Sequence, residues 1–172
     1  MSAGEFNLKD ARDQLTLILS FFPRVDAKLS TLLAIDTGMV GALSASIPSI
    51  QRVTWYMAIA PMISAALIAV SYVYLYRGGF PNINGGHASI IYFKEIAKRT
   101  EAKFIEEYAG RTSESLRGDV LGQVWRNSEI LVEKYRCLKM AFIFMALATV
   151  PFAISLALFA LAKVSIQVSV RP

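Results

Sequence analysis

Cysteine and histidine are almost absent from this sequence, which has one of each, Cys137 and His87, among 172 residues. A single cysteine excludes an internal disulfide and a cysteine-cluster metal site, and a single histidine leaves no ligand set for zinc or di-iron. The sequence also lacks a P-loop and any nucleophile beside a credible base. His87 stands in a glycine-rich stretch, where we expect it to be solvated. We therefore predict no enzyme activity, no metal and no cofactor.

Charged residues are missing from residues 53–76, a run of 24 residues. A helix of this length rises about 36 Å, enough to cross a hydrocarbon core of about 30 Å. A soluble chain of this size seldom buries so long a helix that is apolar on every face. The run predicts a membrane span. Aromatic residues, which favour the headgroup level, stand at both of its ends: Trp55, Tyr56, Tyr72, Tyr74 and Tyr76.

Residues 29–47 and 140–162 predict two further spans. The later one is free of charge and contains Pro151, whereas the earlier one is interrupted by Asp36. Small residues in the earlier span recur at spacings of three and four, which suits close contacts with other helices. These residues are Gly38, Gly41, Ala42 and Ala45.

Asp36 is the one charged residue within the predicted spans. A carboxylate at this depth costs about 2.5–3.5 kcal/mol on insertion, so we expect Asp36 to face other helices or water. It is either an ion or proton site, or a protonated or hydrogen-bonded packing residue. We favour packing, because a relay needs further buried partners and none is evident in the other spans.

The predicted fold is an all-α membrane protein with an N-terminal amphipathic helix, three transmembrane helices and a cytoplasmic helical hairpin between the second and third spans. No cleavable signal is evident, and the amphipathic stretch is too short to cross a bilayer. The hairpin would pair a helix over Ser89–Tyr108 with one capped by Ser113 that runs unbroken to Ala162. The predicted segments are the amphipathic region 1–28, the transmembrane hairpin 29–76 (spans 29–47 and 53–76), the sensor region 77–139, the third span 140–162 and the tail 163–172.

Positive charge is distributed unevenly around the predicted spans. Fifteen of the eighteen Lys and Arg residues lie in residues 1–28 and 77–139, and three lie in the 48–52 turn and the tail. Lys and Arg collect in cytoplasmic segments, so we expect a cytoplasmic N-terminus and an external C-terminus. This distribution accounts for the net charge of +5 without a nucleic-acid polymer as partner.

Polar side chains interrupt the apolar stripe of the helix before the third span. At about 100° per residue, Gln123, Asn127 and Lys134 fall on the face that ought to pack. Buried polar groups need partners, because an unmet one costs about 1–3 kcal/mol. Either they form an internal network, in which Lys134 pairs with Asp26 or Asp36, or they line a pocket for a small anion.

Several short motifs follow one another in order along the chain. They are Asp26-Ala27-Lys28-Leu29-Ser30, Phe80-Pro81-Asn82, Ile90-Ile91-Tyr92-Phe93, Glu107-Tyr108, Asp119 with Gln123, and Lys134-Tyr135 with Leu138. In this order and spacing the chain, from about residue 8 to residue 162, resembles the transmembrane effector family of the Pycsar antiphage systems.

The resemblance implies an effector in the bacterial inner membrane that is functionally linked to a pyrimidine nucleotide cyclase. Its partners would be a cyclic pyrimidine mononucleotide, cyclic UMP or cyclic CMP, and the lipid bilayer, which it impairs in an infected cell. A non-enzymatic accessory or structural subunit of a membrane complex is the alternative. A holin-like pore without a ligand and a transporter that uses Asp36 are further readings.

A cyclic mononucleotide offers one negative charge and a flat pyrimidine, so its site needs a cation, an aromatic face and amides. Trp125 and Gln123 point apart on one helix, so a site that uses both needs two subunits, which favours a homo-oligomer. Residues of the required types in the sensor region are Arg126, Asn127, Gln123, Trp125 and Tyr108.

The charge asymmetry gives a prediction of topology. Single cysteines that replace Ser49 and Ser169 should react with an impermeant maleimide from outside the cell, in a chain whose Cys137 has been changed to alanine. A cysteine that replaces Ser113 should react only after the cells are opened. The reverse labelling pattern would overturn the predicted orientation.

Overall fold

The computed structural model describes residues 7–48, 55–80, 86 and 88–169, with side chains described as far as residue 163. The described residues form helices and short connections and contain no β-strand. Three stretches are long and apolar enough to cross a membrane: Leu8–Ser46, Trp55–Gly79 and Ser113–Lys163. The predicted all-α membrane fold is confirmed. His87, most of the 48–52 turn, residues 81–85 and the end of the tail lie outside the described residues.

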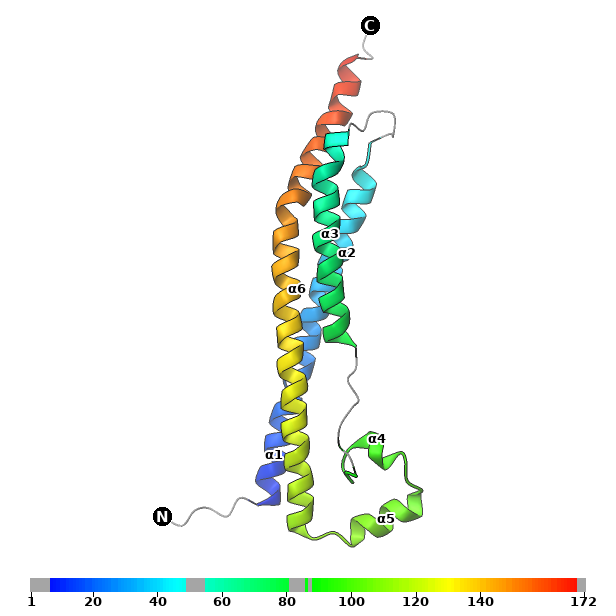
Figure 1. Ribbon diagram of the computed structural model, residues 1–172, viewed down its shortest axis with the longest axis vertical. Helices are drawn as coiled ribbons and strands as arrows, with labels where there is room; N and C mark the ends of the chain where they lie inside the picture. Colours follow the sequence, from blue (N-terminus) through cyan, green and yellow to red (C-terminus); the bar gives the residue numbers. More distant parts are fainter. Residues whose placement is uncertain (1–6, 49–54, 81–85, 87, 170–172) are drawn as a thin grey trace, which may run out of the picture. The chain divides into compact units, whose positions relative to one another are not determined.

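The helices differ greatly in length (Figure 1). α6 is the longest, with 57 residues, and the predicted unbroken helix from Ser113 to Ala162 is confirmed. The chain divides into two compact units, one formed by Met1–Val25 with Phe80–Lys134 and the other by Asp26–Gly79 with Tyr135–Pro172. The helices are α1 (Leu8–Leu19), α2 (Phe22–Ser46), a 3-10 turn (Trp55–Ala58), α3 (Ile59–Gly79), α4 (Phe93–Ile96), α5 (Glu101–Ala109) and α6 (Ser113–Ser169).

The N-terminal helix is joined to the first span by two residues. α1 starts with a capping box, in which Asn7 Oδ1 accepts from Asp10 N and Asp10 Oδ2 accepts from Asn7 N, both at 3.0 Å. α2 starts at Phe22, so Pro23 lies in its first turn, where its missing N–H removes no helical hydrogen bond. Leu8–Ser46 therefore forms one long, nearly continuous helical stretch.

α2, α3 and α6 lie alongside one another over their apolar stretches (Figure 1). Their buried positions follow steps of three, four or seven residues, as in helices packed by knobs into holes. The buried residues are Leu29, Leu32, Asp36, Met39 and Leu43 on α2, Ser64, Ile68, Ser71, Leu75 and Gly78 on α3, and Cys137, Ala141, Ala148, Ser155 and Phe159 on α6.

Small residues recur every seventh position where α3 meets α6. Ser71 Oγ lies 3.1 Å from Ala141 O, within hydrogen-bond distance, and Ser64 Oγ donates to Ala148 O at 3.4 Å. A serine side chain reaches the backbone of a neighbouring helix only where the two helices approach closely, which small residues allow. Gly78 continues the series, because a Cβ there would lie 3.0 Å from Cys137 Cβ. We call Ser64, Ser71, Gly78, Ala141 and Ala148 the small-residue seam.

The small residues that the sequence predicted at helix contacts lie elsewhere. Gly38 and Gly41 are exposed on α2, and a Cβ added to either would meet no atom within 4 Å. Ala42 and Ala45 are exposed as well. Among the described residues no atom lies close to Gly38 or Gly41, so the predicted contacts at these glycines are not made within one chain. The buried face of α2 is the one that carries Asp36.

The predicted single helix over Ser89–Tyr108 is two short helices instead. Ser89 Oγ accepts from Ile91 N at 3.1 Å and from Tyr92 N at 3.0 Å, which holds these residues outside a helix. Thr100 then caps α5, with its side chain accepting from Lys103 N. Thr112 rather than Ser113 caps α6, because Thr112 Oγ1 accepts from Ser115 N at 3.2 Å.

Two adjacent glycines at the end of α3 provide a test of the seam. Gly78→Ala should lower stability by about 1–3 kcal/mol, because the added methyl group meets Cys137 and Leu29 side chains. Gly79→Ala is the matched control, since no atom lies within 4 Å of its Cβ position. The measurement is the thermal denaturation midpoint of each purified variant in detergent. Equal midpoints for the two variants would contradict the close packing at Gly78.

Candidate functional site

The predicted ligand-binding residues of α6 differ in exposure. Gln123 is 6% exposed, and Asn127 is half-buried one turn further on. Asn127 Nδ2 donates to Gln123 O at 2.8 Å, so this amide is already bonded to its own helix. Trp125 is 66% exposed and therefore lies on a different side of α6 from Gln123. The structure brings Gln123 and Asn127 together and separates Trp125 from them.

Arg126 and Tyr108 are also accessible. Arg126 Nη1 lies 3.0 Å from Glu129 Oε2, an ion pair that is partly exposed to solvent. An exposed pair of this kind is weak, so an anionic ligand can compete for the guanidinium. Tyr108 is 43% exposed on α5, with its ring centroid 5.8 Å from that of Phe104. These side chains supply a cation and two aromatic faces at the surface of the unit that contains Phe80–Lys134.

Arg99 anchors the segment before α6, a role that the sequence analysis missed. Its side chain is 13% exposed, and its Nε lies 2.8 Å from Glu107 Oε2 on α5. Its two other nitrogens donate to backbone carbonyls, Nη1 to Ser89 O at 3.0 Å and to Glu95 O at 2.7 Å, and Nη2 to Ala88 O at 3.2 Å. A guanidinium bonded on every side positions the backbone around it.

Asp119 fastens the same segment from α6. Its Oδ2 accepts from Ile90 N at 2.8 Å, and the Ile90 side chain is 2% exposed. Before Ile90, the backbone at Gly86 and Ala88 adopts left-handed conformations, with φ of 68° and 57°. A Cβ on Gly86 would lie 2.5 Å from the Tyr92 ring, so only glycine fits there. Arg99 and Asp119 thus have structural roles.

Asp36 lies in the other unit and is completely buried. Its Oδ2 accepts from Ser71 Oγ at 2.6 Å, and the same hydroxyl lies 3.1 Å from Ala141 O. Asp36 Oδ1 is buried without a hydrogen-bond partner among the described residues. Asp36 and Ser71 therefore form a polar layer within the three-helix packing. No three His, Cys, Asp or Glu side chains in the described part of the chain gather as a metal site requires.

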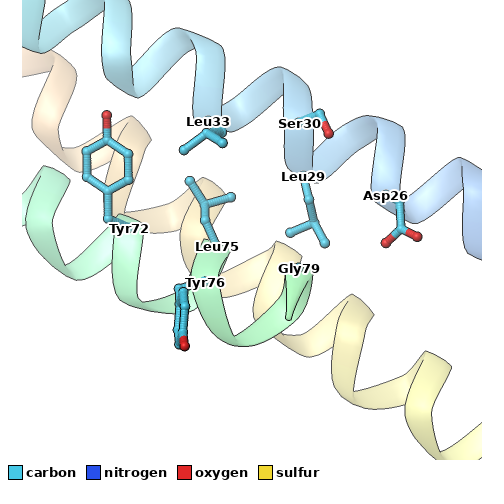
Figure 2. Close-up of a pocket in the computed structure, with 8 residues that line it drawn as sticks. All are labelled: Asp26, Leu29, Ser30, Leu33, Tyr72, Leu75, Tyr76 and Gly79. Carbon is cyan, nitrogen blue, oxygen red and sulfur yellow. The ribbon is translucent and has the colours of Figure 1, made fainter. Parts of the chain in front are cut away.

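A cavity of about 500 Å³ opens between α2 and α3 (Figure 2). Asp26 lies at one end of this group of residues and Tyr72 at the other, with leucines between them. The tyrosine hydroxyl lies 2.9 Å from Thr37 Oγ1. The walls are mainly apolar and include no cation, so the cavity lacks a partner for a phosphate. The pairing of Lys134 with Asp26 stays a prediction.

Comparison with known families identifies the chain. The model of the Pycsar effector protein domain matches residues 10–161. This chain belongs to the Pycsar effector family. The resemblance predicted from the short motifs is confirmed, and the Pycsar match extends from α1 to the apolar part of α6.

Pycsar effectors act in antiphage defence, and membership links this membrane protein to a cyclic nucleotide signal. The Pycsar effector transmembrane domain is not a known enzyme family. No curated protein and no solved structure matches the chain.

The polar layer at Asp36 gives a further prediction. Ser71→Ala removes the hydrogen bond to a buried carboxyl group and should lower stability by about 1–3 kcal/mol. Replacing both residues, as Asp36→Leu with Ser71→Ala, should restore much of that loss, because no unmatched polar group then remains. Thermal denaturation in detergent measures both changes, with the exposed Ser30→Ala as control. A double variant that is less stable than Ser71→Ala alone would contradict this account of the polar layer.

Proposed function

We propose that this Pycsar effector senses a cyclic pyrimidine mononucleotide, cyclic UMP or cyclic CMP, and then disrupts the bacterial inner membrane. The sensor would be residues 77–139 on the cytoplasmic side, and the effector would be the three spans. The observation that carries the proposal is the composition of α6. One helix of 57 residues holds four of the five candidate ligand residues in its first half and an apolar span in its second half.

The accessible groups on α6 and α5 suit this ligand. Arg126 offers a cation to the cyclic phosphate, and Trp125 and Tyr108 offer faces for the pyrimidine to stack on. Gln123 and Asn127 supply amides for the base edge after they rearrange. Because Trp125 is exposed while Gln123 is buried, a site that uses both takes the tryptophan from a second subunit. A homo-oligomer is therefore part of the proposal.

The energetics also favour several subunits acting together. A ligand shifts an equilibrium only by its difference in affinity for the two states, and about 5.5 kcal/mol moves it from 1:99 to 99:1. One hydrogen bond to a charged group contributes about 1.5–3 kcal/mol, which is too little alone. Occupation of two or more sites in one assembly supplies the required difference. The response to the messenger should accordingly be cooperative.

The test uses liposomes that contain the purified full-length protein and a trapped fluorescent dye. Cyclic UMP, cyclic CMP and cyclic AMP are added in turn. We expect one pyrimidine nucleotide to release the dye with a Hill coefficient above one, and cyclic AMP to have no effect. Arg126→Ala should abolish release, because the phosphate then lacks its cation.

Glu129→Gln is the matched control for Arg126→Ala. It breaks the same 3.0 Å ion pair but keeps the Arg126 guanidinium, so release should persist or need less nucleotide. Circular dichroism confirms that each variant remains helical. If liposomes with folded wild-type protein retain the dye whichever nucleotide is added, messenger-triggered disruption is refuted. That result would favour an accessory subunit of a membrane complex. Equal loss in both variants would assign Arg126 a structural role.

A further inference from the structure

A second cavity, of about 440 Å³, opens between α2 and α6 within the unit formed by Asp26–Gly79 and Tyr135–Pro172. Two lysines line it together with aromatic and apolar side chains. The residues that matter here are Lys28 and Leu32 from α2, and Tyr135, Leu138, Lys139 and Phe142 from α6. Leu32 is 6% exposed and forms part of the inner wall, whereas both lysines are exposed.

Both lysines stand at the boundary between charged and apolar sequence. Lys28 directly precedes the apolar stretch 29–47, and Lys139 directly precedes the charge-free stretch 140–162. Lysines at the ends of spans extend their ammonium groups toward the headgroups while their methylene chains stay on apolar surface. Tyr135, one turn before Lys139 on α6, adds a phenol to the lining of the cavity.

The charge of this cavity distinguishes it from two others in the same unit. The 500 Å³ cavity carries Asp26 and no cation, and a 370 Å³ cavity beside Phe159 is lined by no charged residue. In the described part of the chain, neither Lys28 nor Lys139 forms an ion pair with a carboxylate. Two like charges that share one cavity repel each other, and an anion between them removes that repulsion.

We propose that this cavity binds one anionic phospholipid. The headgroup phosphate lies between the two lysine ammonium groups, and an acyl chain lies along Leu32, Leu138 and Phe142. A free phosphate would use the cations and leave the apolar wall uncovered, whereas a phospholipid uses both. Basic cavities between membrane helices bind anionic headgroups by the same chemistry.

The lipid contacts α2 and α6 together, so it stabilises the arrangement in which these two helices are packed as they are here. The topology predicted above puts this end of the spans on the cytoplasmic side, so the lipid would come from the cytoplasmic leaflet. The site itself does not depend on messenger binding. Failure of nucleotide-triggered dye release would leave it unaffected.

The experiment uses the full-length protein in dodecyl maltoside, titrated with phosphatidylglycerol, phosphatidylcholine or inorganic phosphate. Native mass spectrometry counts the retained lipids, and tryptophan fluorescence gives the thermal denaturation midpoint. We expect phosphatidylglycerol alone to be retained at one molecule per chain and to raise the midpoint. At about 1 kcal/mol per lysine, Lys28→Gln or Lys139→Gln should weaken its affinity about fivefold, and both together about 25-fold.

Lys163→Gln is the matched control, because Lys163 is also exposed on α6 but at the opposite end of the apolar stretch. It should bind phosphatidylglycerol like the wild type, and Lys28→Arg with Lys139→Arg should keep most of the affinity. The proposal would be overturned if the wild type retained phosphatidylcholine as well as phosphatidylglycerol. It would also be overturned if the double glutamine variant retained as much phosphatidylglycerol as the wild type. A midpoint raised as much by inorganic phosphate would assign the site to a free anion. If the double glutamine variant changed its oligomeric state but bound lipid as the wild type does, the cavity would be assigned to contact with a second copy of the chain.

Discussion

The close approach of α3 and α6 along the small-residue seam is the contact on which the packing of the three spans depends. Lipid tails are as apolar as leucine, so burying apolar side chains gives little drive for helices to associate in a bilayer. Packing and hydrogen bonds must supply it. Ser71 and Ser64 provide both, because each is small enough to admit the other helix and bonds to a carbonyl on it, Ala141 O or Ala148 O.

A seam that repeats every seven residues does not by itself fix how far α3 is inserted along α6. Asp36 and Met57 remove the ambiguity. If α3 slid one heptad so that Gly78 replaced Ser71, the buried Asp36 carboxyl would lose its hydroxyl donor. If it slid the other way, Met57 would replace Ser64 and bring a long side chain toward Ala148. A buried polar residue that selects one register at some cost in stability is known from coiled coils. Asp36 has the position and the partner for that role.

The sequence predicted features of the spans that are dictated by the lipid. Two charge-free runs and the apolar stretch around Asp36 predicted the three apolar helices, and the insertion cost of a carboxylate put Asp36 toward other helices. It did not reveal which residue would meet Asp36, because a serine within an apolar run gives no signal of its own. Spacing likewise showed that small residues would form contacts, but Gly38 and Gly41 had the right spacing on the wrong face.

The connection between α3 and α6 was harder to predict for a different reason. Apolar periodicity over Ser89–Tyr108 favoured one helix, but side chains of Ser89 and Thr100 bond to nearby backbone and interrupt it. Arg99 finds its partners only after that interruption, since they include the carbonyls of Ala88 and Ser89. Local hydrogen bonding of side chains to the backbone therefore determines the path of the chain here, and the apolar periodicity of the sequence does not. Among the candidate ligand residues, the sequence did indicate that Trp125 and Gln123 face different ways, because this follows from helix geometry alone.

The same seam bears on how such a protein could stay inert in a membrane and still damage it. Hydrogen bonds between membrane helices, like those of Ser71 and Ser64, contribute about 0.6–2 kcal/mol each, and water that reaches them competes for the same donors and acceptors. The buried Asp36 oxygen without a partner would also be hydrated at once if water reached it. Under the proposed function, water that enters as the spans begin to separate weakens the contacts that hold them together. Opening of the helices and loss of the membrane barrier then promote each other, which makes the transition abrupt.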